Sequence, residues 1–167
     1  AVELQLEALS LFDELGADAP LEDKAACLTG LGVVNYRLGQ KQTALGYFEG
    51  ALMLQQRVDD TRGISNSLNN IGVVLKSLER FEESLEHYRR ALLLRRSMGE
   101  TKSVADTLSN IGVLNFERGD HAAALASFRE VLAIREQLGD RFGLVQVIAN
   151  IGELYRNMGQ LDQSLEY

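Results

Sequence analysis

The sequence has few of the residues that form disulfides, metal sites and helix breaks. Its 167 residues include one cysteine, one proline, two histidines and no tryptophan. A single cysteine, Cys27, excludes an internal disulfide and leaves the redox compartment open. A single proline is typical of a mostly helical chain, because proline interrupts helix interiors. His87 and His121 have no converging set of further ligands, so we interpret them as solvated surface side chains and expect no metal and no cofactor.

Basic charge and long apolar runs are also scarce. The formal net charge is −7, and an acidic chain without a basic stripe is a poor partner for nucleic acid or for an anionic membrane surface. No apolar run approaches the roughly 20 residues that span a bilayer. Residues 1–10 lack the basic and apolar regions of a signal peptide. We therefore expect a cytoplasmic protein that binds neither nucleic acid nor membrane.

Residues suited to catalysis do not gather at any point of the sequence. Cys27 lies on an apolar helix face without basic neighbours, which indicates a buried and inert thiol. Gly30 and Gly32 do not follow a strand, so they do not form a dinucleotide loop. A basic cluster on one helix is expected to be solvated and paired with Glu82 and Glu86 of the same helix; it consists of Arg89, Arg90, Arg95 and Arg96. The sequence predicts a protein that is not an enzyme.

What the sequence does contain is one short segment that recurs. Asn-Ile-Gly-Val stands at 70–73 and again at 110–113, Asn-Ile-Gly-Glu stands at 150–153, and a weaker copy, Gly-Leu-Gly-Val, stands at 30–33. The shared glycine therefore recurs every 40 residues, at Gly32, Gly72, Gly112 and Gly152. A period of this size predicts a stack of similar structural units.

Apolar spacing and turn residues divide each unit into two helices. We expect helices over 1–15, 22–38, 42–57, 61–78, 82–97, 101–118, 122–137 and 141–158, with another beginning at 161. Glycines end several of them, and caps for the helices that follow are expected from Asp59-Asp60-Thr61, from Met98-Gly99-Glu100-Thr101 and from Leu138-Gly139-Asp140. The repeats are then 22–60, 61–100, 101–140 and a truncated 141–167, preceded at 1–16 by the second helix of another repeat. Neither end carries a polar cap, so we expect a piece of a longer array.

These positions resemble the tetratricopeptide repeat. The first helix of each repeat shows Leu28-Leu31-Gly32 and its three counterparts, and the second shows Ala44-Phe48-Ala51 and two counterparts. The resemblance implies an all-α fold, a right-handed superhelical solenoid of antiparallel helix pairs. Gln56, Arg96 and Glu136 replace the usual proline, so the second helix can run on for a further turn. The 40-residue length is similar to the subgroup found in kinesin light chains, Pins-type adaptors and bacterial signalling proteins.

The recurring glycine predicts a close approach between helices. Glycine inside a helix costs about 1 kcal/mol relative to alanine, so four copies at one position indicate that a side chain has no room there. We expect Tyr88 and Phe128, or the alanines of the second helix, to occupy that space.

The resemblance also implies that the first helix of each repeat lines a concave groove. The expected groove residues are Asn66, Asn69, Asn70, Val73, Lys76, Asp106, Asn110, Val113, Phe116, Asn150, Glu153 and Arg156. Their asparagines would form a ladder of amides able to pair with a peptide backbone. The alternative is that they brace neighbouring helices. A clamp for a C-terminal carboxylate, known in some relatives, is not expected, because Val33, Val73 and Val113 occupy an asparagine position of that clamp and its lysines are missing.

We therefore predict a non-enzymatic scaffold that binds a peptide segment or partner protein in its groove. One alternative is a peptide-sensing module of a larger signalling protein, and another is the regulatory region of an enzyme. A helical repeat that reads RNA is disfavoured by the charge. We also expect end-to-end self-association of this fragment, burying Ile148, Leu154 or Leu161.

Overall fold

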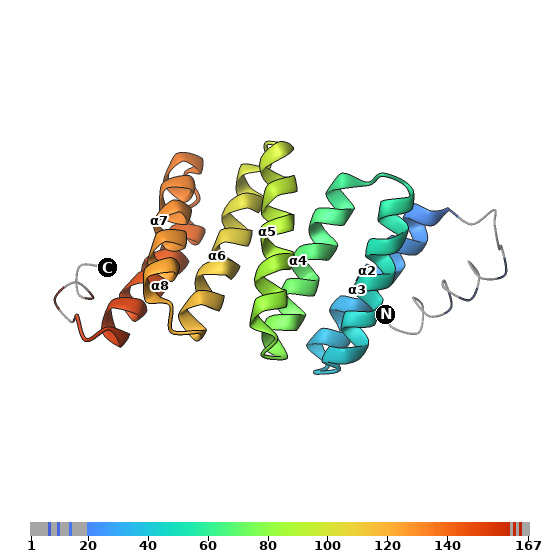
Figure 1. Ribbon diagram of the computed structural model, residues 1–167. Coiled ribbons are helices and arrows are strands. Elements are labelled where there is room, and N and C mark those ends of the chain that lie inside the picture. Colours follow the sequence, from blue (N-terminus) through green and yellow to red (C-terminus); the bar gives the residue numbers. More distant parts are fainter. Residues whose placement is uncertain are drawn as a thin grey trace. The chain divides into compact units, whose positions relative to one another are not determined.

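The computed structural model describes residues 20–160, together with residues 7, 10, 14, 162 and 164. This part of the chain contains seven helices and no strand (Figure 1). They are α2 (Leu21–Arg37), α3 (Lys41–Arg57), α4 (Thr61–Ser77), α5 (Phe81–Ser97), α6 (Thr101–Glu117), α7 (His121–Leu138) and α8 (Arg141–Asn157). Every bound lies within one residue of the expected helix. The helices expected over 1–15 and from 161 lie outside the continuously described range.

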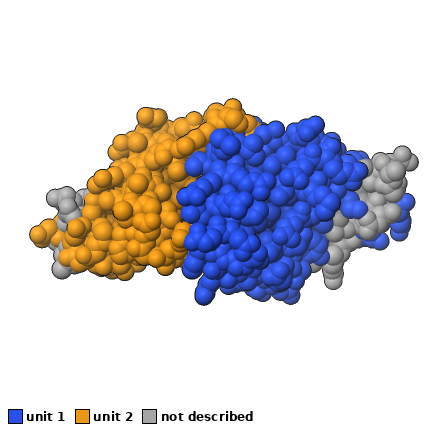
Figure 2. Space-filling model, viewed as in Figure 1, with its two compact units in different colours: residues 1–94 blue, residues 95–167 orange. Residues whose placement is uncertain are grey.

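The chain forms two compact units, residues 1–94 and residues 95–167 (Figure 2). In unit 1, α2 packs on α3 and α3 on α4. Its core is an apolar cluster from three helices: Ala44, Leu45, Phe48, Ile71, Val74 and Leu75. In unit 2, α6 packs on α7, and α8 contacts both. Burial of the apolar face of each helix against the next is the main stabilising term.

The turns between helices follow from local residue chemistry. Gly39 and Gly119 have φ values of 78° and 79°, a region that favours glycine because it has no Cβ. Asp60 and Asp140 accept hydrogen bonds from the backbone N–H groups of Gly63 (2.9 Å) and Gly143 (3.0 Å), so these two expected caps are confirmed. The cap expected from the segment Met98-Gly99-Glu100-Thr101 is wrong. Glu100 precedes α6 without a side-chain cap, and the Thr101 hydroxyl instead donates to the Gly99 carbonyl.

The repeated glycines lie against aromatic rings, as expected from their spacing. A Cβ built on Gly32 or on Gly72 would stand 2.6 Å from a ring carbon of the second helix of the same repeat, closer than carbon atoms can pack. The pairs are Gly32 with Phe48, Gly72 with Tyr88 and Gly112 with Phe128. These three ring side chains are almost wholly buried. The close-approach prediction is therefore confirmed, with aromatic rings rather than alanines in contact.

Long polar side chains recur at a second repeat position, within the last turn of α3, α5 and α7. Gln55, Arg95 and Arg135 are each only 6% exposed. Gln55 accepts a hydrogen bond from the Ser67 hydroxyl at 2.7 Å. Each of these side chains therefore forms polar bonds from the second helix of a repeat to other helices or turns, at a buried position where an apolar side chain would be common.

The Arg95 interactions contradict the expectation of a solvated arginine cluster. Its guanidinium donates to the Thr107 hydroxyl at 2.6 Å and to the Ser103 carbonyl at 3.1 Å. Burial lowers the pKa of Arg95, while Asp106 and Glu100 oppose that shift. Arg95 projects to the covered face of α5, so it does not share the solvated face of Arg89 and Arg90, which are exposed.

Val147 stands 40 residues after Thr107 and offers no hydroxyl, so Arg135 bonds to other partners. It pairs with Asp106, and it pairs with Asp140 at 2.5 Å. The Asp140 carboxylate thus both caps α8 and holds Arg135. The Gly143 N–H, and then Arg135, lower the pKa of Asp140.

The two histidines are less exposed than expected, and the cysteine is less buried than expected. His87 is half-buried, and burial, followed by the nearby Arg90 charge, lowers its pKa. The His121 ring lies 6.1 Å from the Phe116 ring, centroid to centroid. Cys27 is half-buried rather than buried. Within the described residues no group of three or more acidic, histidine or cysteine side chains is arranged to hold a metal ion.

None of the helices in the described part of the chain is long and apolar enough to cross a bilayer. Leu154, expected at an end-to-end contact, is completely buried within the fold, whereas Phe142 and Val145 of α8 are 76% and 67% exposed. Leu154 therefore cannot contribute to such a contact.

Candidate functional site

Two of the predicted groove residues line an apolar cavity in unit 1. Asn70 and Val73 of α4 face Val33, Tyr36 and Arg37 of α2 across a space of about 180 Å³, with Phe48 of α3 and Val74 as further lining residues. We call this cavity the unit 1 socket. Phe48 is the ring that fills the gap left by Gly32, so the glycine contact also fixes one wall of the socket.

Four other predicted groove residues line a cavity of similar size in unit 2. Val113 and Phe116 of α6 face Asn150 and Glu153 of α8 across about 190 Å³, and the remaining lining residues are Glu117 and Phe128. We call this cavity the unit 2 socket. All six of its residues stand 80 residues after residues of the unit 1 socket. The two sockets are therefore the same structural position, two repeats apart.

Each socket presents one asparagine amide beside an aromatic ring. Asn70 and Asn150 are half-buried, and among the described residues neither amide has a hydrogen-bond partner. Asn66, Asn69 and Asn110 each interact with another residue of the chain. An amide with one donor group and one acceptor group suits a peptide backbone, which needs both. The structure thus separates the asparagines into two that face a socket unpaired and three that are engaged within the fold.

Charge distinguishes the rims of the two sockets. The unit 1 socket carries the exposed Arg37 and no acidic residue, whereas the unit 2 socket carries the exposed carboxylates of Glu117 and Glu153. Arg156 lies 3.3 Å from Glu153, and both side chains are mostly exposed. An exposed pair of this kind contributes only about 0–1 kcal/mol. Glu117 also interacts with another residue of the chain. The unit 2 rim therefore carries two carboxylates, both engaged within the chain, where the unit 1 rim carries none.

The Asn150 amide also borders a second, more polar cavity of unit 2. This space of about 340 Å³ is lined by Ser109, Arg135, Gly143, Gln146, Val147, Ala149 and Asn150. The Arg135 charge is already opposed by Asp106 and Asp140. Arg156 and Glu153 border a third space with Ser164 and Ala149. The exposed face of α8 thus carries adjoining cavities, with Asn150 between the apolar one and the polar one.

The remaining predicted groove residues lie apart from the sockets. Asp106 forms an ion pair with Arg135, so the Asp106 carboxylate is already paired within the fold. Lys76 is half-buried and Asn66 is exposed, and both interact within the chain. Asn110 is half-buried on α6 and is not a lining residue of the unit 2 socket. The sequence prediction therefore included six socket residues but did not group them.

A signal for that grouping exists in the sequence, at a period of 80 rather than 40 residues. Tyr36 and Phe116 are aromatic, while the intervening repeat position holds Lys76 and then Arg156. Asn35 and Asn115 alternate in the same way with Leu75 and Tyr155. Comparing every second repeat would have indicated where an aromatic wall recurs, and would have added Arg37 and Glu117 to the site.

Comparisons with known proteins agree with the helix pairs and the glycine contacts. A family model described as tetratricopeptide repeat matches residues 63–137, and a second model with the same description matches residues 145–167. The two matches together cover more than half of the chain. The chain belongs to the tetratricopeptide repeat family. A search of the curated proteins finds no match.

Solved structures with the same fold include three of different length. BtubC (BKLC) from P. vanneervenii is 24% identical, with a TM-score of 0.88 over 98% of this chain and 67% of that one. A Rap protein complexed with competence and sporulation factor is 22% identical, with a TM-score of 0.81 over 99% and 47%. A putative kinesin light chain from Podosopora anserina is 15% identical, with a TM-score of 0.79 over 99% and 81%. The chain thus spans about half the length of the Rap protein.

The fold is therefore an all-α tetratricopeptide-repeat solenoid. Repeats of this family are in general non-catalytic scaffolds for protein–protein interaction. Membership of this family assigns a protein-binding role to the chain. In the described part of the structure, the two sockets combine an apolar cavity with an asparagine amide that has no partner among the described residues.

Proposed function

We propose that the chain binds an extended or helical protein segment along the first helices of its repeats, without catalysis. The unit 1 and unit 2 sockets would each accept an apolar side chain of that segment, and Asn70 and Asn150 would pair with its backbone. The observation that carries the proposal is the recurrence of one socket at equivalent positions of both units, with an aromatic wall and an amide that has no partner among the described residues. Pockets for alternate side chains and amides for the backbone are a common means of peptide recognition.

The test is a selection of linear peptides from a displayed random library on the immobilised chain. Peptides that bind are then measured against Asn70→Ala combined with Asn150→Ala. Each lost hydrogen bond contributes roughly 0.5–1.5 kcal/mol, so we expect affinity to fall by about one to two orders of magnitude with an unchanged thermal melt.

The matched control is Gln56→Ala combined with Gln137→Ala, which removes two exposed amides from the second helices. This variant should bind with the affinity of the unchanged chain. Full affinity in the asparagine variant, or an equal loss in the glutamine variant, would contradict the proposal. A fall in melting temperature together with affinity would assign the two asparagines a structural role instead.

A second candidate is a peptide-sensing module within a larger signalling protein. It is favoured by the fold likeness to a Rap protein solved with competence and sporulation factor, and by the fact that the chain spans about half of that protein's length. A sensor changes its compaction when it binds, because a ligand shifts the population of two states. A selected peptide that changes the radius of gyration in solution scattering would favour the sensor. A peptide that binds without changing it would favour the scaffold.

A further inference from the structure

We infer that the unit 2 socket selects a segment in which an aliphatic side chain is flanked by lysine or arginine. This inference rests on the proposed function, and it assigns the chemistry of the partner at one socket. The apolar requirement comes from the walls, which are Val113 and the rings of Phe116 and Phe128. Phe128 is held in place against Gly112, and Phe116 lies beside the His121 ring.

The basic requirement comes from the rim. Glu117 follows Phe116 directly, and Glu153 stands one helical turn after Asn150, so carboxylates border the cavity from α6 and from α8. A leucine-like side chain inside the cavity would place its neighbouring residues within reach of both. Opposite charges at such distances attract even in a largely aqueous environment, whereas acidic flanking residues would be repelled.

Glu117 and Glu153 both have interactions within the chain, and both carboxylates are exposed. Arg156 pairs with Glu153, and because both side chains are exposed a peptide lysine can replace Arg156 at little cost. Arg135 borders the neighbouring polar cavity, but Asp106 and Asp140 both pair with it. The unit 1 socket has valine and arginine where the unit 2 socket has Glu153 and Glu117, so it lacks this preference.

The probes are three capped peptides, Gly-X-Leu-X-Gly, in which X is lysine, glutamine or glutamate. Each is titrated into the ¹⁵N-labelled 167-residue chain, and the side-chain amide signals of Asn150 and Asn70 report the two sockets separately. We expect the lysine peptide to bind at Asn150 about three- to tenfold more tightly than the glutamate peptide at low ionic strength. The ratio should approach one in about 1 M salt, where exposed charges are screened.

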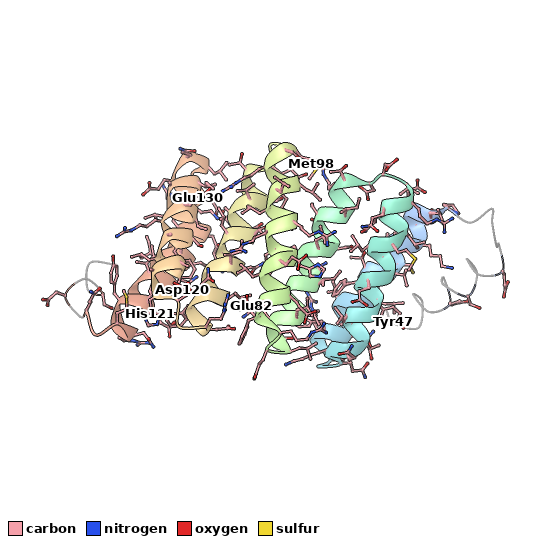
Figure 3. All side chains as sticks on the ribbon, viewed as in Figure 1. Tyr47, Glu82, Met98, Asp120, His121 and Glu130 are labelled. Carbon is pink, nitrogen blue, oxygen red and sulfur yellow. The ribbon has the colours of Figure 1, made fainter. Side chains whose placement is uncertain are left out.

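Two charge-matched variants locate the effect. Glu117→Gln with Glu153→Gln should remove the preference at Asn150. Glu130→Gln with Glu136→Gln changes the net charge equally on the exposed side of α7 and should leave the preference intact. Figure 3 shows Glu130 well separated from Asp120 and His121. His121 is the first residue of α7, and its ring lies beside the Phe116 ring.

The outcomes separate this inference from the proposed function. Equal affinity for the three peptides at Asn150, or a preference that survives Glu117→Gln with Glu153→Gln, would overturn the charge selection and leave groove binding intact. If no peptide shifts the Asn150 or Asn70 signals at any concentration, the proposed function fails as well.

Discussion

The two sockets share six repeat positions but differ in every charged residue at the rim. Valine, an aromatic ring, phenylalanine and asparagine recur at the wall positions, whereas Arg37 is replaced by Glu117 and Val73 by Glu153. The walls are part of the core packing, so the fold constrains them. The charged rim residues are exposed, so substitutions there should cost little stability. The two copies of the socket therefore keep their wall residues and differ in the charge of the rim.

Gln55 and Arg135 stand at equivalent repeat positions but form different bonds. In unit 1, Gln55 accepts a neutral hydrogen bond from the Ser67 hydroxyl of α4, the helix that follows. In unit 2, Arg135 forms ion pairs with Asp106 of α6, the helix before it, and with Asp140, which caps α8. Arg95, also in unit 2, bonds instead to neutral groups of Ser103 and Thr107. Variants at equivalent positions can therefore test which properties are common to both units.

The glycine contacts should be equivalent in the two units, and they should give the largest effects. We expect Gly72→Leu and Gly112→Leu each to lower the free energy of unfolding by about 3 kcal/mol or more, because no space exists beside Tyr88 or Phe128. Urea denaturation measures the loss, and hydrogen exchange should locate it in unit 1 for the first variant and in unit 2 for the second.

The control for both is Gly46→Leu in α3. A Cβ at Gly46 meets nothing within 4 Å, and leucine is a better helix former than glycine by several tenths of a kcal/mol. This variant should be neutral or slightly stabilising. Destabilisation of similar size in all three variants would mean that leucine itself, rather than the ring contact, is the cause.

The polar connections should differ between units. Arg135→Met should cost about 1–3 kcal/mol, since it removes charged hydrogen bonds from a buried site. Gln55→Met should cost about 1 kcal/mol, because only the buried Ser67 hydroxyl loses its partner. Thermal melts compare the two. Arg135→Met combined with Asp106→Asn tests the assignment, since the second change should then add little. Equal costs for Gln55→Met and Arg135→Met would remove the distinction between the units.

Most of the fold was predictable from the sequence because its signals are local. Glycine at turns, aspartate at caps and apolar spacing predicted seven helices to within one residue. The cap expected from Met98-Gly99-Glu100-Thr101 was wrong, because Thr101 is already the first residue of α6 and the N-cap position holds Glu100, whose side chain makes no cap bond. Arg95 was misjudged because four nearby arginines suggest one solvated surface, although helical geometry turns Arg95 to the covered face.

The sites were less predictable than the fold, for a different reason. A 40-residue period describes what all repeats share, which is the packing. The sockets recur every second repeat, because Lys76 and Arg156 stand where Tyr36 and Phe116 supply an aromatic wall. Whether an asparagine faces a cavity or bonds within the fold depends on its neighbours in space. The sequence could not separate Asn70 and Asn150 from Asn110 on that basis.

Exchanging the rim charges should exchange the preferences of the sockets. In the variant Arg37→Glu with Glu117→Arg, the lysine peptide should gain affinity at Asn70 and lose it at Asn150, each by about threefold, as for an exposed pair. The net charge of the chain is unchanged by this exchange. The same amide signals measure both sockets in one titration. Preferences that stay with Asn150 after the exchange would show that Glu117 and Arg37 do not decide the charge selectivity of the two sockets.

The smallest expected effect is a difference between the two units in how their stability changes at mildly acidic pH. His87 in α5 stands in unit 1, and the corresponding residue of unit 2 is Ser127, whose hydroxyl donates to the Ala123 carbonyl. Burial and Arg90 lower the pKa of His87 in the folded state, against the raising effects of Glu86, Glu49 and Glu83. The unfolded chain therefore binds the proton more readily, so stability is complete above the ordinary histidine pKa of about 6.5 and decreases as the pH falls below it.

Because His87 is only half-buried, the decrease in melting temperature between pH 7.5 and 5 should be less than about 2 °C. Hydrogen exchange should show it in unit 1. His87→Gln should remove this part of the pH dependence. Arg90→Gln should reduce it, because the folded-state pKa then moves back toward its ordinary value. Unit 2 should lose stability only at lower pH than unit 1. The pKa of Asp140 is depressed, and its cap of α8 weakens only as the pH falls through that depressed value. A decrease above pH 5 that persists in His87→Gln, or that appears first in unit 2, would contradict this assignment.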